Sequence, residues 1–336
     1  RGGRGGLAAP LVEVTPGDRS LIGPLSVEWI PVTHSTPETC ALCISVGQTR
    51  ILHTADWKID AAPVVGPAWS DKRFEALGVE GVDAVICDST NALQAGRSVT
   101  EGRVAQGLSG GMQRCEGRVV VGCFSSNIAR IQTLSQIAAD TGRYLSVLGR
   151  SAAGMANCAQ QVGLFPSHFK PIHAEHLGYL PPREVLAIAT GSQGESGAAL
   201  HRLVAQTHPH LSLDAGDTVI LSSRTIPGNE ASVARLIEGF RARGIYVLEA
   251  DSSDTPLHAS GHPYQDELRD LYQLLKPSLV VPVHGEAPHM AANARIAKQS
   301  GASAALTGVN GDLFYLSPVP GVRRRYAPVG RLQWCE

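Results

Sequence analysis

Short apolar runs separated by turn residues dominate the first part of the chain. Residues 25–29 alternate between apolar and polar side chains, which predicts a strand with one buried face. Two further runs, residues 41–46 and 51–54, flank Gly47-Gln48, a break typical of a hairpin. Residues 82–87 form another apolar run. The first part of the chain is therefore predicted to supply several strands of one sheet.

The middle of the chain alternates between buried strands and amphipathic helices. In residues 231–243 the apolar side chains recur at i, i+3, i+4 and i+7, and Gly244 follows where a helix would end. Strand–helix–strand repeats of this kind imply a parallel, doubly wound sheet. Strands are predicted at residues 118–124, 144–148, 217–222 and 245–249, and helices at about 125–140 and 231–243.

The last part of the chain returns to a strand and a helix. Residues 279–283 are predicted to form a strand and residues 288–299 a helix. Val309-Asn310-Gly311-Asp312 is predicted to be the turn of a hairpin.

Composition narrows the class of protein. The 336 residues are 43% hydrophobic and 18% charged, as in a globular protein, and the formal net charge of −1 gives no global positive field for nucleic acid. Seven scattered cysteines indicate a reducing compartment, which favours the cytoplasm. No stretch approaches the ~20 apolar residues of a membrane span. Cys40-x-x-Cys43 lies in a predicted strand, where residues three apart face opposite sides, so a buried strand is favoured over a redox or zinc site.

Good metal ligands stand where predicted strands end. His34, Asp56, Asp88 and His284 each follow an apolar run. In α/β proteins, ligands collect at the carboxyl edge of the sheet, and imidazole with carboxylate suits Zn²⁺ or Mn²⁺. Taken singly, each residue is better explained as a loop cap or a hydrogen-bonded histidine; only the four together make a metal site equally well supported.

The stretch "LHASGHP" places two histidines around Ala259, Ser260 and Gly261. The glycine allows close approach of an anion, the Ser260 hydroxyl can contact phosphate oxygens, and one imidazole can exchange a proton. The alternative is an ordinary turn with exposed histidines.

Eight motifs in order resemble one family. The stretches "VTHSTPET", "HTADWKID", "CDSTNA", "FSSNIARIQ", "TGSQGE", "IPGNE", "HASGH" and "PVHGE" resemble the metallo-β-lactamase-fold nucleases with a β-CASP insertion, and among them the bacterial ribonuclease J family. The resemblance implies an incomplete metallo-β-lactamase αββα sandwich with an inserted, doubly wound β-CASP domain. It implies domain boundaries at 1–91 (metallo-β-lactamase), 92–250 (β-CASP), 251–312 (metallo-β-lactamase again) and 313–336 (linker).

The resemblance also implies roles for the residues at the strand ends. His34 matches a ligand of one metal, Asp56 the aspartate that bridges two metals, and His284 the residue that completes the second metal's ligands. Asp88 matches an acid placed for proton transfer, and His262 a catalytic histidine. Histidine at position 284 goes with RNA rather than DNA substrates in this superfamily.

Further contacts and partners follow from the same resemblance. The loop His258–His262 matches a substrate-phosphate loop. Ser125, Asn127 and Ser192 are expected to contact the RNA backbone, although a helix cap and a tight turn explain them equally well. The family implies two divalent metals, with Zn²⁺ favoured over Mn²⁺ or Mg²⁺, and 5′-monophosphorylated single-stranded RNA as substrate. It also implies a homodimer or tetramer and no membrane.

One family motif is absent from this sequence. His-x-His-x-Asp-His, which supplies the main metal ligands and lies upstream of the position of His34, occurs nowhere in the 336 residues. Because the chain also opens without methionine, we expect a fragment of a longer protein with an incomplete two-metal site. Two other functions stay open: a small-ester or thioester metallo-hydrolase, and a non-catalytic homologue that binds RNA or a partner subunit.

Overall fold

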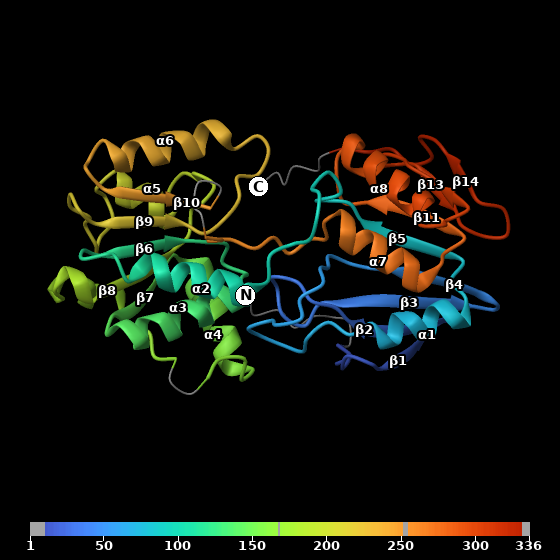
Figure 1. Ribbon diagram of the computed structural model, residues 1–336, viewed down its shortest axis with the longest axis horizontal. Coiled ribbons are helices and arrows are strands. Elements are labelled where there is room, and N and C mark those ends of the chain that lie inside the picture. Colours follow the sequence, from blue (N-terminus) through green and yellow to red (C-terminus); the bar gives the residue numbers. More distant parts are fainter. Residues whose placement is uncertain (1–10, 167–168, 251–254, 331–336) are drawn as a thin grey trace.

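The computed structural model describes residues 11–166, 169–250 and 255–330. Two lobes lie side by side along the longest axis of the molecule (Figure 1). One lobe is built from the first and last parts of the chain. The other is an insertion from the middle of the chain, as the family resemblance implies.

A seven-stranded sheet forms the centre of the first lobe. Its strand order is β1-β2-β3-β4-β5-β11-β12; neighbours from β1 to β4 pair antiparallel, and those from β4 to β12 pair parallel. Val283 at the end of β11 stands opposite Asp88 at the end of β5. The strands are β1 (Arg19–Ile22), β2 (Leu25–Pro31), β3 (Cys40–Val46), β4 (Thr49–His53), β5 (Ala84–Asp88), β11 (Leu279–Val283) and β12 (Ala304–Ala305).

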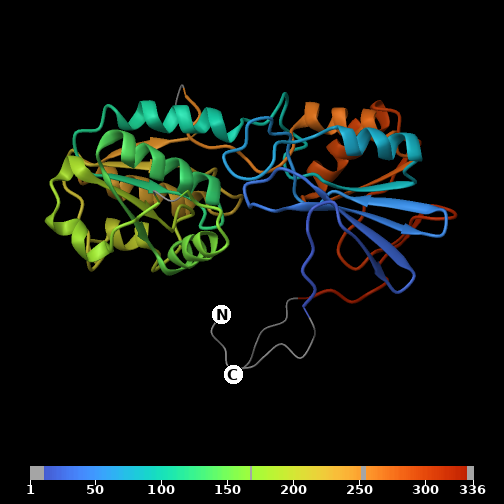
Figure 2. The same cartoon turned by 90° about the horizontal axis from the view of Figure 1, so that it is seen from below.

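Three helices cover one face of this sheet. They are α1 (Lys72–Glu80), α7 (Gln265–Leu275) and α8 (Ala287–Gln299), and Figure 2 shows them together above the strands. Their apolar stripes, including Phe74, Leu271 and Ile296, pack on Leu52 and Val85 in one buried core. On the other face, the small sheet of β13 (Leu313–Tyr315) and β14 (Gly321–Arg323) packs through Phe314 against β5 and β11.

The inserted lobe is a parallel sheet with helices on both faces. Strand order is β10-β9-β6-β8-β7, and every pair is parallel. The doubly wound prediction is therefore confirmed. The strands are β6 (Val119–Gly122), β7 (Tyr144–Leu148), β8 (Val185–Ala189), β9 (Thr218–Leu221) and β10 (Tyr246–Glu249); α2 (Glu101–Met112), α3 (Ile128–Thr141) and α4 (Arg150–Gln161) pack on one face, and α5 (Ala199–Val204) and α6 (Glu230–Arg241) on the other.

The predicted hairpin at Val309–Asp312 is wrong. The chain does turn there, but β12 pairs with β11 and β13 pairs with β14, so the strands on either side of this turn are not partners. A hairpin is instead formed by the next two strands, β13 and β14, which pair antiparallel. Turn-forming residues give the position of a reversal, but they do not say which strands pair across it.

Two segments connect the lobes. The first leads from the end of β5 at Asp88 to α2, and the second leads from β10 to α7. The described residues 89–100 and 255–264 of these segments contain no helix or strand, and His262 and Thr90 within them lie against Asp88 and His284 at the carboxyl ends of β5 and β11. Within the described ranges, no helix is long and apolar enough to cross a membrane.

The contact between α1 and α7 generates a stability prediction. A Cβ on Gly78 of α1 would lie 1.9 Å from the Leu274 carbonyl oxygen of α7. Gly78→Ala should lower the free energy of unfolding by about 1–3 kcal/mol, because backbone must move to accept the methyl group. Urea denaturation measures this change.

Gly110→Ala is the matched control. Gly110 also lies inside a helix, but an added Cβ there meets no atom within 4 Å. This change should stabilise the protein by about 0.5–1 kcal/mol through helix propensity. Equal effects of the two substitutions would contradict the packing described for α1 and α7.

Candidate metal centre and catalytic site

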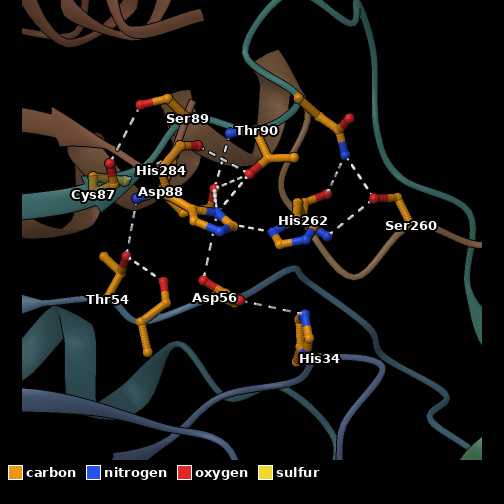
Figure 3. Close-up of polar contacts among 12 residues, drawn as sticks. His34, Thr54, Asp56, Cys87, Asp88, Ser89, Thr90, Ser260, His262 and His284 are labelled. Atoms are coloured by element: carbon orange, nitrogen blue, oxygen red, sulfur yellow. Dashed lines mark hydrogen bonds and ion pairs between the residues drawn. The ribbon is translucent and has the colours of Figure 1, made fainter. Parts of the chain in front are cut away.

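The carboxyl ends of three parallel strands meet at one edge of the first sheet (Figure 3). β4, β5 and β11 are neighbours, so the residues that follow them are brought together although they lie far apart in sequence. Asp56 follows β4, Asp88 is the last residue of β5, and His284 follows β11. The convergence expected from the strand ends is present for these three side chains.

Four side chains form a compact group of possible metal ligands. Asp56, Asp88, His262 and His284 each offer one atom, and these atoms lie within 4.8 Å of one another. His284 Nδ1 is 3.4 Å from an Asp88 oxygen and 3.6 Å from an Asp56 oxygen. Carboxylate oxygen and imidazole nitrogen are the donors that Zn²⁺ and Mn²⁺ accept, so this group fits a divalent cation.

His34 lies beside this group rather than within it. Its Nε2 is 4.0 Å from Asp56 Oδ2, while its Nδ1 accepts a hydrogen bond from the Thr36 amide at 3.0 Å. Burial, followed by the nearby His262, lowers the pKa of His34 to about 4, so the ring is neutral at pH 7. A Cβ on Gly261 would lie 2.6 Å from the His34 ring, so glycine is required for the loop to approach it this closely.

Asp88 and His262 form a buried hydrogen-bonded pair. His262 Nδ1 is 2.7 Å from Asp88 Oδ2, and Asp88 is 1% exposed. The other carboxylate oxygen accepts from the amide and hydroxyl of Thr90 at 2.9 and 2.8 Å. Burial alone would raise the pKa of Asp88, but hydrogen bonds with His262 and His284 outweigh burial and hold the pKa well below its usual range. Asp88 is therefore a carboxylate at neutral pH.

Thr90 also fixes His284. Its hydroxyl is 2.7 Å from His284 Nδ1 and 3.0 Å from the His284 carbonyl oxygen. His284 has a φ of 55°, a left-handed conformation that costs a residue with a Cβ about 1–2 kcal/mol. This backbone turn and the Thr90 contact direct the ring toward Asp88. The hydrogen bond with Asp88 raises the pKa of His284.

A buried amide supports the end of β5 from below. Asn293 of α8 is 0% exposed, and its Nδ2 donates to the Asp88 carbonyl oxygen at 3.1 Å and to Ser89 Oγ at 3.0 Å. The Tyr272 hydroxyl of α7 donates to Asn293 Oδ1. Two helices thus hold the backbone that carries Asp88.

The loop His258–His262 is tied to the segment after β5. Asn91 Nδ2 donates to Ser260 Oγ at 2.7 Å and to the His262 carbonyl oxygen at 3.3 Å. Ala259 is buried. Burial, together with the Arg130 cation, lowers the pKa of His258 to about 3.

The three residues of the inserted lobe that are predicted to contact RNA differ in how exposed they are. Ser125 lines a wide groove with Arg150 and Thr190. Asn127 is buried, and its Oδ1 accepts from the Arg130 amide at the start of α3. Ser192 is 3% exposed. RNA contact by these three residues stays a prediction, and the groove supports it best for Ser125.

Several residues of the site were not identified from sequence. Thr90 and Asn91 lie inside the "CDSTNA" motif, next to Asp88, so the motif is the signal that could have identified them. Tyr272 and Asn293 lie on helices remote in sequence, and nothing in their local pattern indicates a role. Their contribution depends on how α7 and α8 pack.

Comparison with known proteins agrees with this fold and site. Residues 116–240 match the family model "Ribonuclease J, beta-CASP domain", and residues 255–306 match "Zn-dependent metallo-hydrolase RNA specificity domain". Fold and these matches define a metallo-β-lactamase fold with an inserted β-CASP domain.

Relatives narrow the class further. The chain is 41% identical to ribonuclease J of Sinorhizobium meliloti over 96% of this chain and 57% of that protein. It is 37% identical to ribonuclease J of Mycolicibacterium smegmatis over 88% of this chain and 53% of that protein. The chain is thus similar to the ribonuclease J family over most of its length, and it spans just over half the length of these two relatives.

A solved structure supports the fold alone. The crystal structure of a protein of unknown function from Enterococcus faecalis V583 matches with a TM-score of 0.60 at 14% identity, and the match covers 89% of this chain and 66% of that chain.

The Thr90 contacts generate a prediction for metal binding. Thr90→Val keeps the shape of the side chain but removes the hydroxyl that directs His284, so Zn²⁺ affinity should fall about 10–100-fold, as for other outer ligand-orienting groups. Isothermal titration of the purified protein with Zn²⁺ measures this loss.

Thr141→Val is the control, because the Thr141 hydroxyl bonds within α3, away from the site. A Thr90→Val protein that binds Zn²⁺ as tightly as the Thr141→Val protein would show that the hydroxyl does not orient a metal ligand.

Proposed function

We propose that the site hydrolyses RNA phosphodiester bonds with the help of divalent metal ions. One observation carries the proposal: Asp56, Asp88, His262 and His284 come from separate segments and meet within 4.8 Å. Metal ligands alone would suit many roles. The buried Asp88–His262 pair adds a group that can transfer a proton, which a purely structural metal site does not need.

Asp56 and His284 would hold the metal, with His34 beside them. The side chains of Asp56 and His284 are exposed, whereas the Asp88 carboxylate is buried and already accepts hydrogen bonds. We infer two ions, with Zn²⁺ favoured over Mn²⁺ or Mg²⁺, because imidazole is part of the donor set. When bound, such ions supply positive charge for the scissile phosphate and lower the pKa of water.

Asp88 and His262 would manage protons. The Asp88 carboxylate accepts from His262 Nδ1, which fixes the ring's orientation and leaves Nε2 as the atom that exchanges a proton with the substrate. This pairing resembles the carboxylate–imidazole unit used by other hydrolases. Asp88 acts here by holding His262, and its low pKa keeps it ionised for that task.

RNA is the substrate class that the matched domain and the relatives favour. The matched domain is described by its RNA specificity, and the relatives are named ribonuclease J. The loop His258–His262 is expected to contact the phosphate, and Ser125 is expected to contact the RNA backbone. A 5′-monophosphorylated RNA end, a homodimer or tetramer and a cytoplasmic location stay predictions from the family resemblance.

One observation favours a second candidate function. His-x-His-x-Asp-His does not occur in these 336 residues. A chain with the Asp56 and His284 ligands alone would bind RNA or a partner subunit without cutting it. A small-ester hydrolase is less well supported, because the inserted lobe gives such an enzyme no evident benefit.

The proposal is tested by RNA hydrolysis and metal content measured together. Both are compared for the chain as given and for the protein expressed from the longest reading frame that contains it. Asp56→Ala should abolish cleavage and lower metal content, because a ligand is lost. His262→Ala should leave metal content unchanged and lower kcat about 10²–10⁴-fold, the usual contribution of a general acid–base group.

Single-stranded RNA, DNA of the same sequence and a chromogenic ester serve as the three substrates. Cleavage of RNA alone supports the proposal, while ester turnover without RNA cleavage would overturn it. RNA binding without cleavage in both proteins would favour the non-catalytic alternative. Loss of metal from His262→Ala would show that His262 is a ligand and not a proton-transfer group.

A further inference from the structure

A fully buried ion pair lies inside the inserted lobe, next to the segment that returns to the site. Arg130 of α3 is 0% exposed and Glu101, the first residue of α2, is 3% exposed. Arg130 Nη2 lies 3.1 and 3.3 Å from the two Glu101 carboxylate oxygens. Both charges are thus removed from water and paired with each other.

The second terminal nitrogen of the Arg130 guanidinium, Nη1, hydrogen-bonds to the chain that leads to the loop His258–His262. Arg130 Nη1 donates to the carbonyl oxygens of Ser222 at 3.1 Å and Leu257 at 3.2 Å, and to the Ser222 hydroxyl. The Ser222 hydroxyl in turn donates to the Leu257 carbonyl oxygen at 2.5 Å. Leu257 immediately precedes His258, so two donors fix the base of the loop His258–His262.

Glu101 connects the same pair to the segment that carries Asp56. The Glu101 amide donates to Asp60 Oδ2 at 3.0 Å, and that oxygen is 3.2 Å from Lys58 Nζ. Lys58 Nζ also donates to the Val99 carbonyl oxygen at 3.0 Å, in the segment leading into α2. Lys58 and Asp60 are both 1% exposed. A continuous buried polar network therefore joins the Asp56 segment to the base of the His262 loop.

A buried ion pair by itself adds little to the free energy of unfolding. Removing two charges from water costs several kcal/mol per ion, and apolar residues of similar volume often stabilise a core equally well. Hydrogen bonds from a planar guanidinium are directional, so such a pair fixes position more effectively than apolar packing. The loop His258–His262 contains no helix or strand, so its place depends on contacts of this kind.

We propose that Arg130, with Glu101, is a positioning residue that sets the place of His262 against Asp88. The pair holds the base of the His258–His262 loop to the Asp56 segment, so that the His262–Asp88 hydrogen bond forms as the two lobes pack together. This inference rests on the proposed function for its catalytic meaning. The position of His262 can nevertheless be measured without any reaction.

The experiment uses two readouts on the same variants. The first is the downfield proton resonance of His262 Nδ1 in the metal-free protein, assigned by its loss in His262→Ala. The second is kcat for RNA hydrolysis by the protein from the longest reading frame. Melting temperature is recorded alongside, so that loss of position is separated from loss of stability.

Three variants separate the two effects. Arg130→Met leaves Glu101 buried without its partner, so the melting temperature should fall and the His262 resonance should disappear. Arg130→Met with Glu101→Gln removes both charges, so the melting temperature should recover in part while the resonance stays lost and kcat stays at least tenfold low. Arg118→Met is the control, because Arg118 pairs with Asp214 and Asp217 at the opposite end of the same sheet.

Arg118→Met should lower the melting temperature but keep the resonance and kcat. The inference is overturned if the resonance and kcat return with the melting temperature in the double variant, since the pair would then only stabilise the lobe. It is also overturned if Arg118→Met loses the resonance. A wild-type protein that shows the resonance but hydrolyses no RNA would count against the proposed function, while the resonance in the variants still decides the role of Arg130.

Discussion

Burial of the Asp88 carboxylate is the constraint on which the site depends. A carboxylate that is 1% exposed must be fully hydrogen-bonded, because an isolated buried charge is very costly. Thr90 and His262 supply the bonds, and His284 lies 3.4 Å away. Thr90 belongs to the segment of Asp88 itself, whereas His262 and His284 come from distant segments, so the interactions of one buried carboxylate bring those segments together. Asn293 holds the backbone of Asp88 in place beneath them.

The chain connections between the two lobes also pass through the segments that carry Asp88 and His262. The inserted lobe leaves the first sheet after Asp88 and returns through Leu257 and the loop that ends in His262. Its buried polar network reaches Asp60 on one side and Leu257 on the other. The lobes are thus joined by directional hydrogen bonds close to the residues proposed to act on RNA. The candidate site and the lobe interface share the same segments of chain.

The sequence predicted the parts of this structure that depend on local pattern. Periodicity identified β11 and α6 closely, and strand-end chemistry identified Asp56, Asp88 and His284, because parallel strands bring their carboxyl ends to one edge. Pairing beyond the local turn was not predictable, as the wrong hairpin at residues 309–312 shows. Asn293 and the Arg130–Glu101 pair were also not identified, because their roles arise only when helices distant in sequence pack together. Family resemblance, not pattern, assigned separate roles to Asp88 and His262.

The most direct test of the central claim is crystallography of the protein soaked with Zn²⁺, with anomalous scattering recorded at the zinc edge. The account predicts an anomalous peak about 2.0–2.2 Å from donor atoms of Asp56 and His284, with the Asp88–His262 hydrogen bond retained beside it. Zinc bound elsewhere on the molecule, with these side chains turned away from one another, would contradict the account.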